Sequence, residues 1–263
     1  SRLAVLLHRV IFLIIDMNRI ITLVFVLLAS AHLWGQDQNY LHNRTVMDRA
    51  VNTGQVGNSV ILGTMSNSPP GTVVDVYLNP DYRMASFWLY DDNKVAQGFA
   101  ARLDLQRNEF DVYLGKGNIK ALPGNRVRTM MWADSLTKTP QYFVNAQDYK
   151  NKDDVPYIGF FQILSEGEIS LFKLNTVTFK PADHNPTHYT GSKDNRFIKH
   201  TELFYAKGNS ALELPNRKGI LKMMESRKEE VDKFVKVNEL NLTVERHIIA
   251  LFDYYNSLTS TTK

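Results

Sequence analysis

The sequence predicts a mainly β, α+β domain. We expect an antiparallel meander forming a curved sheet, a sandwich or a partly open barrel, with a C-terminal antiparallel helix pair packed on it. Three observations lead to this prediction. Short alternating apolar runs separated by turn residues fill residues 60–205. One of these runs is apolar on both faces, which is typical of a strand inside a sheet rather than at its edge. After residue 216 the apolar period changes from that of a strand to that of a helix.

The doubly apolar run is the first arm of a predicted hairpin over residues 155–179. Its side chains alternate between Tyr157, Phe161 and Ile163 on one face and Ile158, Phe160 and Leu164 on the other. Residues 165–168 form the turn, in which Gly167 can adopt a positive φ, and the second arm begins at Ile169. We therefore expect this hairpin to lie in the middle of the fold.

The other strands follow from the same alternation. They are predicted at residues 60–64, 72–78, 84–90, 95–105, 110–114, 119–122, 126–133 and 141–146, with a last strand at 197–206. Two long polar stretches interrupt the series, at residues 145–154 and 181–196. Prolines and a glycine argue against regular structure in 181–196, and loops of this length usually either serve a function or move.

Two C-terminal helices are predicted at residues 217–236 and 244–258, with Asn216 and Thr243 as candidate N-caps. The short link at 238–242 makes them antiparallel. Each carries an apolar stripe that a two-helix hairpin alone cannot bury, so we expect both helices to pack on the sheet.

The N-terminus resembles an export signal. Residues 17–35 hold a basic start, an apolar stretch and small residues, with cleavage expected after Gly35, so residues 1–16 are interpreted as an upstream extension. The alternative is a retained membrane helix over residues 10–33, which would place Asp16 and Arg19 in the bilayer. We expect an exported protein of the periplasm, the outer surface or the medium. It would have a β domain at 36–216, a helical pair at 217–263 and no stable membrane span after cleavage.

Composition excludes several classes of function. The chain has no cysteine, and therefore no disulfide, thiolate nucleophile or cysteine-linked lipid anchor. The net charge is +4, and removing residues 1–35 takes away three arginines and one aspartate. The mature part then has 28 basic and 26 acidic residues, a charge of +2. This balance argues against a nucleic-acid partner. No nucleotide, dinucleotide or serine-hydrolase motif is present, and no cofactor is expected.

Few residues qualify as site candidates. Asp183, His184 and His188 could be metal ligands, but Pro186 between the histidines disfavours a helix, and we interpret them as a solvated loop without metal. His200 and Glu202 share a strand face and more often make a surface contact than a catalytic pair. Carboxylates in or beside strands could serve a glycosidase, although nothing selects a pair among Asp75, Asp104, Asp111 and Glu168.

Aromatic residues offer a further possibility. They could line a groove for a sugar or lipid, but core packing is the favoured interpretation for Phe87, Trp88, Tyr90, Tyr113, Trp132, Tyr142 and Phe143. The sequence therefore favours a non-enzymatic binding or structural module. The alternatives are a carrier of an apolar small ligand in a half-open β-barrel and a hydrolase with dispersed carboxylates. The partner would be a protein, a glycan or an apolar ligand.

Three stretches together resemble a broad group of uncharacterised exported β-rich proteins of Bacteroidetes-type Gram-negative bacteria. They are Trp34-Gly35-Gln36, the hairpin sequence GFFQILSEG at 159–167 and Tyr254-Tyr255-Asn256-Ser257-Leu258. The resemblance covers most of the chain after residue 35. It implies export and a β-rich fold, and it assigns no activity and no functional residue.

Overall fold

The computed structural model describes Met47 and residues 75–91, 94–133, 139–184, 187 and 190–260. The predicted extension, the signal, the strand at 60–64 and residues 72–74 of that at 72–78 lie outside these residues. Over residues 75–78 the predicted strand is absent, and Tyr77 makes only an isolated bridge to Asp104. The chain divides into two compact units, Ser1–Asp48 and Arg49–Lys263. All that follows concerns the second unit.

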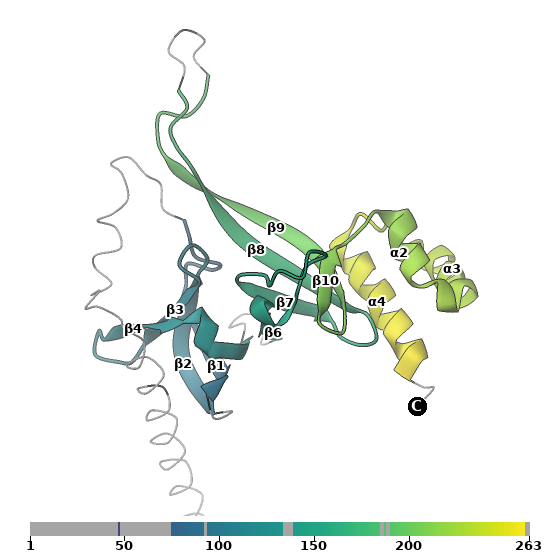
Figure 1. The fold of residues 1–263 in the computed structure, drawn as a ribbon, viewed down its shortest axis with the longest axis horizontal. Helices are drawn as coiled ribbons and strands as arrows, with labels where there is room; N and C mark the ends of the chain where they lie inside the picture. The colour runs from purple at the N-terminus through teal and green to yellow at the C-terminus, as the bar shows by residue number, and fades with distance from the viewer. Residues whose placement is uncertain are drawn as a thin grey trace, which may run out of the picture. The chain divides into compact units, whose positions relative to one another are not determined.

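Ten antiparallel strands form one open sheet (Figure 1). They are β1 (Arg83–Leu89), β2 (Val95–Asp104), β3 (Glu109–Tyr113), β4 (Ile119–Pro123), β5 (Val127–Ala133), β6 (Pro140–Asn145), β7 (Phe160–Ser165), β8 (Ser170–Lys180), β9 (Arg196–Lys207) and β10 (Ser210–Glu213). Their spatial order is β10-β9-β8-β7-β6-β5-β1-β2-β3-β4. The predicted curved antiparallel meander is confirmed. Strand β10 was missed, because a tight turn through Gly208 (φ +62°) follows β9 directly.

The link between β4 and β5 forces the sheet to coil. The two strands are four positions apart in the sheet, a distance of about 19 Å if the sheet were flat. The connection is the single 3₁₀ turn η3 (Gly124–Arg126), and four residue steps span at most about 14 Å. Asn145 fixes this link by donating from Nδ2 to the carbonyl oxygens of Gly124 and Val127, at 2.8 and 2.7 Å.

Aromatic rings fill the inside of this coil. Phe110 of β3 lies 5.1 Å from Phe87 of β1 and 5.0 Å from Phe160 of β7, both edge to face. These strands are not neighbours in the sheet, so the three rings meet across the interior. Leu103, Leu122 and Met130 are buried as well. The described part of the coil is therefore a packed core.

The central hairpin has the expected position, because β7 lies between β6 and β8. Phe161 packs among the rings of Tyr149, Tyr157, Phe172 and Phe204 on one face of the sheet. Phe160 and Leu164 pack on the other side, as predicted.

One residue of this prediction was wrong. Ile158 is 78% exposed, although the alternation had placed it on a core face. The strand begins only at Phe160, after Gly159 (φ +107°) turns the chain, so the period of two does not extend back to Ile158.

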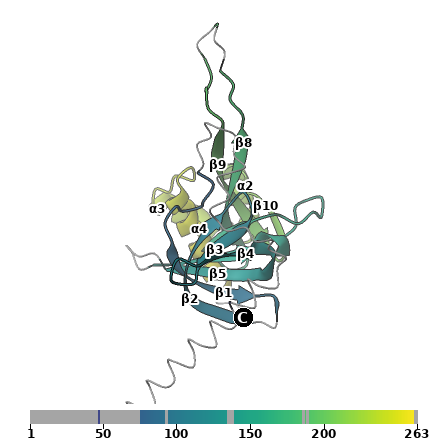
Figure 2. The same cartoon turned by 90° about the vertical axis from the view of Figure 1, so that its left-hand side faces the viewer.

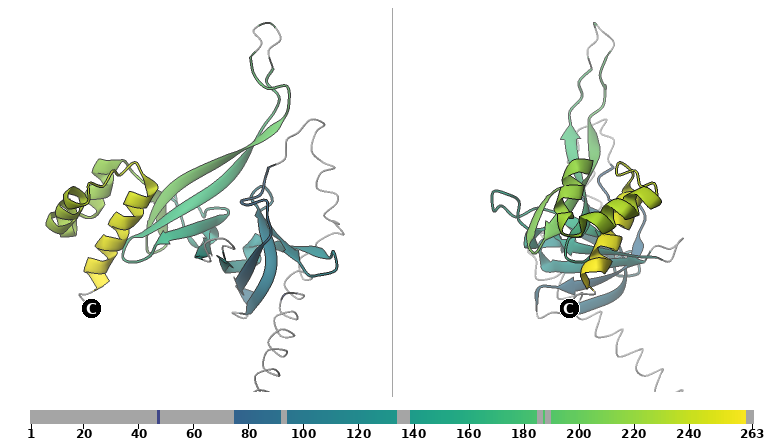
Figure 3. Two further views of the ribbon diagram at one scale, coloured as in Figure 1. Left: turned by 180° about the vertical axis from the view of Figure 1, so that it is seen from behind. Right: turned by 90° about the vertical axis from the view of Figure 1, so that its right-hand side faces the viewer.

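Three helices and a short turn form the C-terminal region seen in Figure 3. They are α2 (Arg217–Met223), η5 (Glu225–Arg227), α3 (Lys228–Val237) and α4 (Glu245–Ser260). The single helix predicted at 217–236 was wrong, since it breaks at Met224. The buried Met224 side chain and a 3.0 Å hydrogen bond between Ser226 Oγ and Tyr255 Oη hold the break against α4. These tertiary contacts override local helix propensity.

Helix α4 is hydrogen-bonded to the turn between β7 and β8 through Asn256. The buried Asn256 accepts a hydrogen bond from Ile169 N at 3.2 Å and donates to Ile169 O at 3.0 Å and to Ser165 Oγ at 3.3 Å. Gly167 is required here, because a Cβ at this position would lie 2.3 Å from Asn256 Cγ. Ile169, Leu171 and Phe252 share one core cluster, so the helices are packed on the sheet as predicted.

Within the described residues, none of the helices combines the length and the apolar character needed to cross a membrane.

Replacing Asn256 by Ala is expected to destabilise the whole chain. The substitution leaves the buried N–H and C=O of Ile169 without partners, at a cost of about 2–4 kcal/mol in the free energy of unfolding. Denaturant titration followed by circular dichroism measures it. The control is Asp253→Ala, at an exposed position of the same helix, which should change stability by less than about 0.5 kcal/mol. Equal stability of the two variants would contradict this role of Asn256.

Candidate functional site

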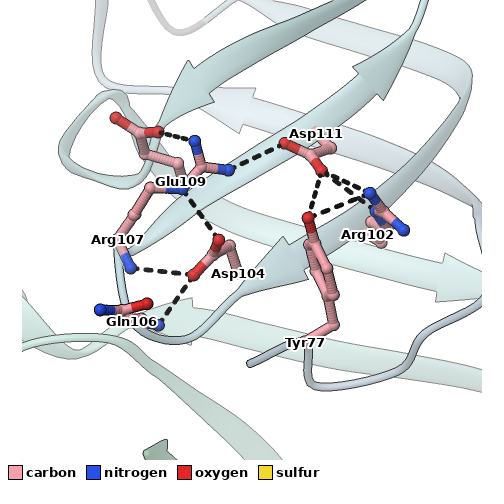
Figure 4. A network of polar contacts seen from close by, with 7 residues as sticks. All are labelled: Tyr77, Arg102, Asp104, Gln106, Arg107, Glu109 and Asp111. Carbon is pink, nitrogen blue, oxygen red and sulfur yellow. Dashed lines mark hydrogen bonds and ion pairs between the residues drawn. The ribbon is translucent and has the colours of Figure 1, made fainter. Parts of the chain in front are cut away.

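Among the described residues, the two buried carboxylates belong to an ion-pair cluster on β2, β3, the turn between them and the segment before β1, shown in Figure 4. We call it the Asp104–Asp111 cluster; its members are Tyr77, Arg102, Asp104, Gln106, Arg107, Glu109 and Asp111. The two aspartates are only 3% and 0% exposed. Buried carboxylates are retained when cations and hydrogen bonds compensate them, and the strand register supplies this compensation. Arg102 is the direct cross-strand partner of Asp111, and Asp104 is that of Glu109.

Each aspartate accepts several hydrogen bonds. Asp111 Oδ2 accepts from Arg102 Nε and from Tyr77 Oη, each at 3.0 Å, while its Oδ1 accepts from Arg107 Nη2 at 3.2 Å. Asp104 Oδ1 accepts from the backbone N–H groups of Gln106 and Arg107, each at 2.9 Å. Its Oδ2 accepts from Arg107 Nε at 2.8 Å. Arg107 therefore bridges the two carboxylates.

Two tyrosines cover the other arginine. The guanidinium carbon of Arg102 lies 3.8 Å from the ring centre of Tyr77 and 4.8 Å from that of Tyr82, and both are cation–π distances. Burial, with the charge and hydrogen bond of Asp111, raises the pKa of Tyr77 to about 12. Tyr77 therefore stays protonated at physiological pH and serves as a hydrogen-bond donor.

The third carboxylate of the cluster, Glu109, differs from the aspartates in that its pKa is raised. Burial raises the pKa of Glu109, the charge of Arg107 opposes this increase, and those of Asp104 and Asp111 add to it. For Arg107, burial alone would lower the pKa, but the hydrogen bond and charge of Asp104, with Asp111 and Glu109, raise it overall. The cluster thus stabilises the charged form of Arg107 and makes ionisation of Glu109 less favourable than in water.

The chemistry that this arrangement supports is structural. A glycosidase needs one carboxyl group free to donate a proton and one free to attack or to activate water. Asp104 and Asp111 instead direct their oxygens at arginine and backbone donors, so the cluster fastens β2 to β3.

The other two carboxylates named from the sequence are also ion-paired. Asp75 Oδ1 lies 2.6 Å from Lys199 Nζ, and Glu168 Oε1 lies 3.4 Å from Lys207 Nζ. Of the four, the structure brings together only Asp104 and Asp111. The exposed His200 and Glu202 lie two apart on β9, as expected from the sequence.

The aspartate of the candidate metal loop, Asp183, makes a hydrogen bond and an ion pair within the protein. Asp183 Oδ1 accepts from Ser192 N at 2.7 Å, and Oδ2 lies 2.9 Å from Lys180 Nζ. His184 is partly exposed, and His188 lies outside the described residues. Where the structure describes the chain, no three histidine, aspartate or glutamate side chains gather as metal ligands would. The absence of a metal remains a prediction.

The aromatic residues divide into three groups, one of which is the half-buried pair Trp88 and Tyr90. Phe87, Trp132 and Phe143 are core residues, as the favoured interpretation had it. Tyr113 and Tyr142 are 41% and 45% exposed. They do not form part of the packed interior.

A second feature is the outer half of the β8–β9 hairpin, visible in Figures 1 and 2. We call it the arm and define it as the six paired rows from Asn175–Thr201 to Lys180–Arg196. Pairing of β7 with β8 ends at Leu174, and pairing of β10 with β9 ends at Phe204. Phe179 and Phe197 contact each other on one side of the arm at 5.3 Å, and Phe179 is 43% exposed. A ribbon of two strands alone is only marginally stable, so the arm is expected to contribute little to the stability of the fold.

Sequence reasoning selected two carboxylates of the cluster but missed Arg102, Arg107 and Tyr77. The signal was present in part, because Arg102 and Asp104 alternate with the apolar residues of the predicted strand. Their pairing across to Asp111 depends on register, which the sequence alone did not fix. The arm follows from a difference in strand length. Strands β8 and β9 have 11 and 12 residues, whereas the strands that flank them, β7 and β10, have 6 and 4.

Comparison with known proteins gives no match: no family model fits the chain, and no curated protein or solved structure is significantly similar to it.

Two substitutions in the cluster should have opposite effects. Asp111→Asn removes a buried charge from between two arginines and is expected to cost about 3–5 kcal/mol in the free energy of unfolding. Glu109→Gln should not destabilise the chain at pH 7, because the raised pKa of Glu109 means that its ionised form is disfavoured on folding. Chemical denaturation at pH 7 compares the two. An equal loss in the free energy of unfolding for Glu109→Gln and Asp111→Asn would overturn this account.

Asp183 should titrate unusually low. The hydrogen bond from Ser192 N, then Lys180, lowers its pKa to about 2. A lowered folded-state pKa stabilises the fold above the unfolded value of about 3.9, and this contribution disappears as the pH falls towards 2. Carboxyl carbon shifts followed by NMR measure the titration. Lys180→Met should raise the pKa part of the way, and an unchanged value would show that Lys180 has no part in it.

Proposed function

We propose that this chain is a non-enzymatic binding module, exported to the periplasm or cell surface, that contacts its partner through the arm. One observation carries the proposal: β8 and β9 continue for six rows past the last strands paired with them. Those rows expose an aromatic side chain and add nothing to the described core. A two-stranded ribbon is only marginally stable by itself, and a partner that binds it would account for its length. The proposed export is inferred from residues 17–35.

The alternatives are less well supported. A carrier needs an internal cavity of a few hundred Å³. Phe87, Phe110 and Phe160 occupy the interior of the coil in direct contact. A hydrolase with dispersed carboxylates needs groups free to exchange protons, and the four carboxylates considered are each ion-paired.

Trimming the arm tests the proposal. Residues 177–199 are replaced by Asn-Gly, which joins the directly paired Thr176 and His200 by a two-residue turn. Since the removed rows pack mainly on each other, the melting temperature should change by no more than about 5 °C. Binding to cell envelopes of a Bacteroidetes-type Gram-negative bacterium, measured by co-sedimentation, should fall about tenfold or more.

The matched control removes exposed apolar side chains elsewhere. Val155→Thr with Ile158→Thr changes two such residues outside the arm and should leave binding unchanged. A trimmed chain that folds and still co-sediments like the full chain would refute the proposal.

A further inference from the structure

One ion pair joins the arm to the coiled half of the sheet. Lys199 Nζ of β9 lies 2.6 Å from Asp75 Oδ1, although the two residues are 124 positions apart. The polar contacts of Thr201 and Lys180 stay within the β8–β9 hairpin. Among the described residues, no other hydrogen bond or ion pair links the six rows of the arm to a part of the chain outside this hairpin. The pair is therefore in a position to fix the direction of the arm.

The residues that follow Asp75 are held firmly at the end of β2. Leu105 N donates to Val76 O, and Leu78 N donates to Leu103 O, each at 2.9 Å. The side chain of Val76 is also buried. The carboxylate of Asp75 therefore extends from a fixed part of the coil.

The arm has much less support than this. Pairing of β8 with β7 ends at Leu174, and pairing of β9 with β10 ends at Phe204. Within the described chain, the six rows are held by each other and by the ion pair of Lys199. An ion pair between partly exposed side chains shifts an equilibrium by about 1.5- to 5-fold. Such a shift is small for a folded core, but it is enough to change which directions a projecting two-stranded ribbon populates.

Lys199 lies on the aromatic face of the arm. The paired rows Val177–Lys199 and Phe179–Phe197 are separated by one row, so their side chains share a face. Phe179 is 43% exposed while the ion pair is formed. The pair therefore restrains the arm and leaves its aromatic face accessible.

We infer that Asp75 is a positioning residue for the arm, whose ion pair with Lys199 holds the arm in the direction in which its aromatic face meets the partner. This inference rests on the proposed function. A ribbon that is already oriented loses less conformational freedom on binding than one that swings, so its affinity is higher. Because the pair is electrostatic and partly exposed, salt should weaken it.

Double electron–electron resonance on the full chain measures the direction of the arm. The chain has no cysteine, so spin labels attach only at the substitutions Thr178→Cys on the arm and Gln97→Cys on β2, both at exposed positions. Asp75→Asn should broaden the distribution of distances between the labels. About 1 M NaCl should broaden it in the labelled chain that retains Asp75. A distribution unchanged by Asp75→Asn would overturn the inference.

A charge swap separates the effect of the pair from that of either residue. Asp75→Lys should broaden the distribution, and adding Lys199→Asp should narrow it again, because the swapped pair has the same combined side-chain length. A merely structural defect at Asp75 would not be rescued in this way, so failure of the rescue would contradict the inference. The matched control is Asp154→Asn, which breaks the exposed ion pair with Lys150 in another loop and should leave the distribution unchanged.

Envelope binding distinguishes this inference from the proposed function. In the co-sedimentation assay, Asp75→Asn should weaken binding about two- to fivefold, and the charge swap should restore it. If trimming the arm abolishes binding but Asp75→Asn does not weaken it, the arm remains the binding element and the positioning role is wrong. If the trimmed chain still binds, the proposed function fails, and this inference fails with it.

Discussion

The three-residue link from β4 to β5 is the constraint on which the rest of this sheet depends. It joins strands that are four positions apart, so the first five strands must coil. Coiling brings Phe87, Phe110 and Phe160 together across the interior. Asn145 holds the link by donating two hydrogen bonds, to the carbonyl oxygens of Gly124 and Val127. The later strands then add outward from β5 in simple succession and end in the helical region.

The polar cluster on β2 and β3 shows how a buried charge can be structural. Arg107 is held by both aspartates, and Arg102 contacts two tyrosine rings while it bonds to Asp111. Pairs of this kind contribute little net stability compared with an apolar substitute, but they are strongly coupled to register. A slip of β3 against β2 by one residue would leave Asp111 on the wrong face, without either arginine. We therefore interpret the cluster as a device that fixes register rather than as a catalytic centre.

Sequence reasoning succeeded where the physics is local. Alternation located strands β1 to β9 to within a few residues, and the doubly apolar run at 160–164 placed its strand inside the sheet. It failed where tertiary contacts determine the bounds of a helix or strand. Met224 and Ser226 break a helix whose apolar period runs on without interruption, and Gly159 exposes Ile158 by ending the alternation early. The Asp104–Asp111 cluster could be recognised only in part, since register and not spacing unites Arg102 with Asp111.

The bond between Asn256 and Ile169 has a consequence for the order of events during synthesis. The two residues are 87 positions apart. The β7–β8 turn leaves the ribosome long before the side chain that satisfies its backbone. Until α4 is made, the centre of the sheet has an apolar face without its cover and a polar turn without its partner. The β7–β8 turn is thus completed only after a further 87 residues have been synthesised, and until then its apolar surroundings stay accessible to chaperones.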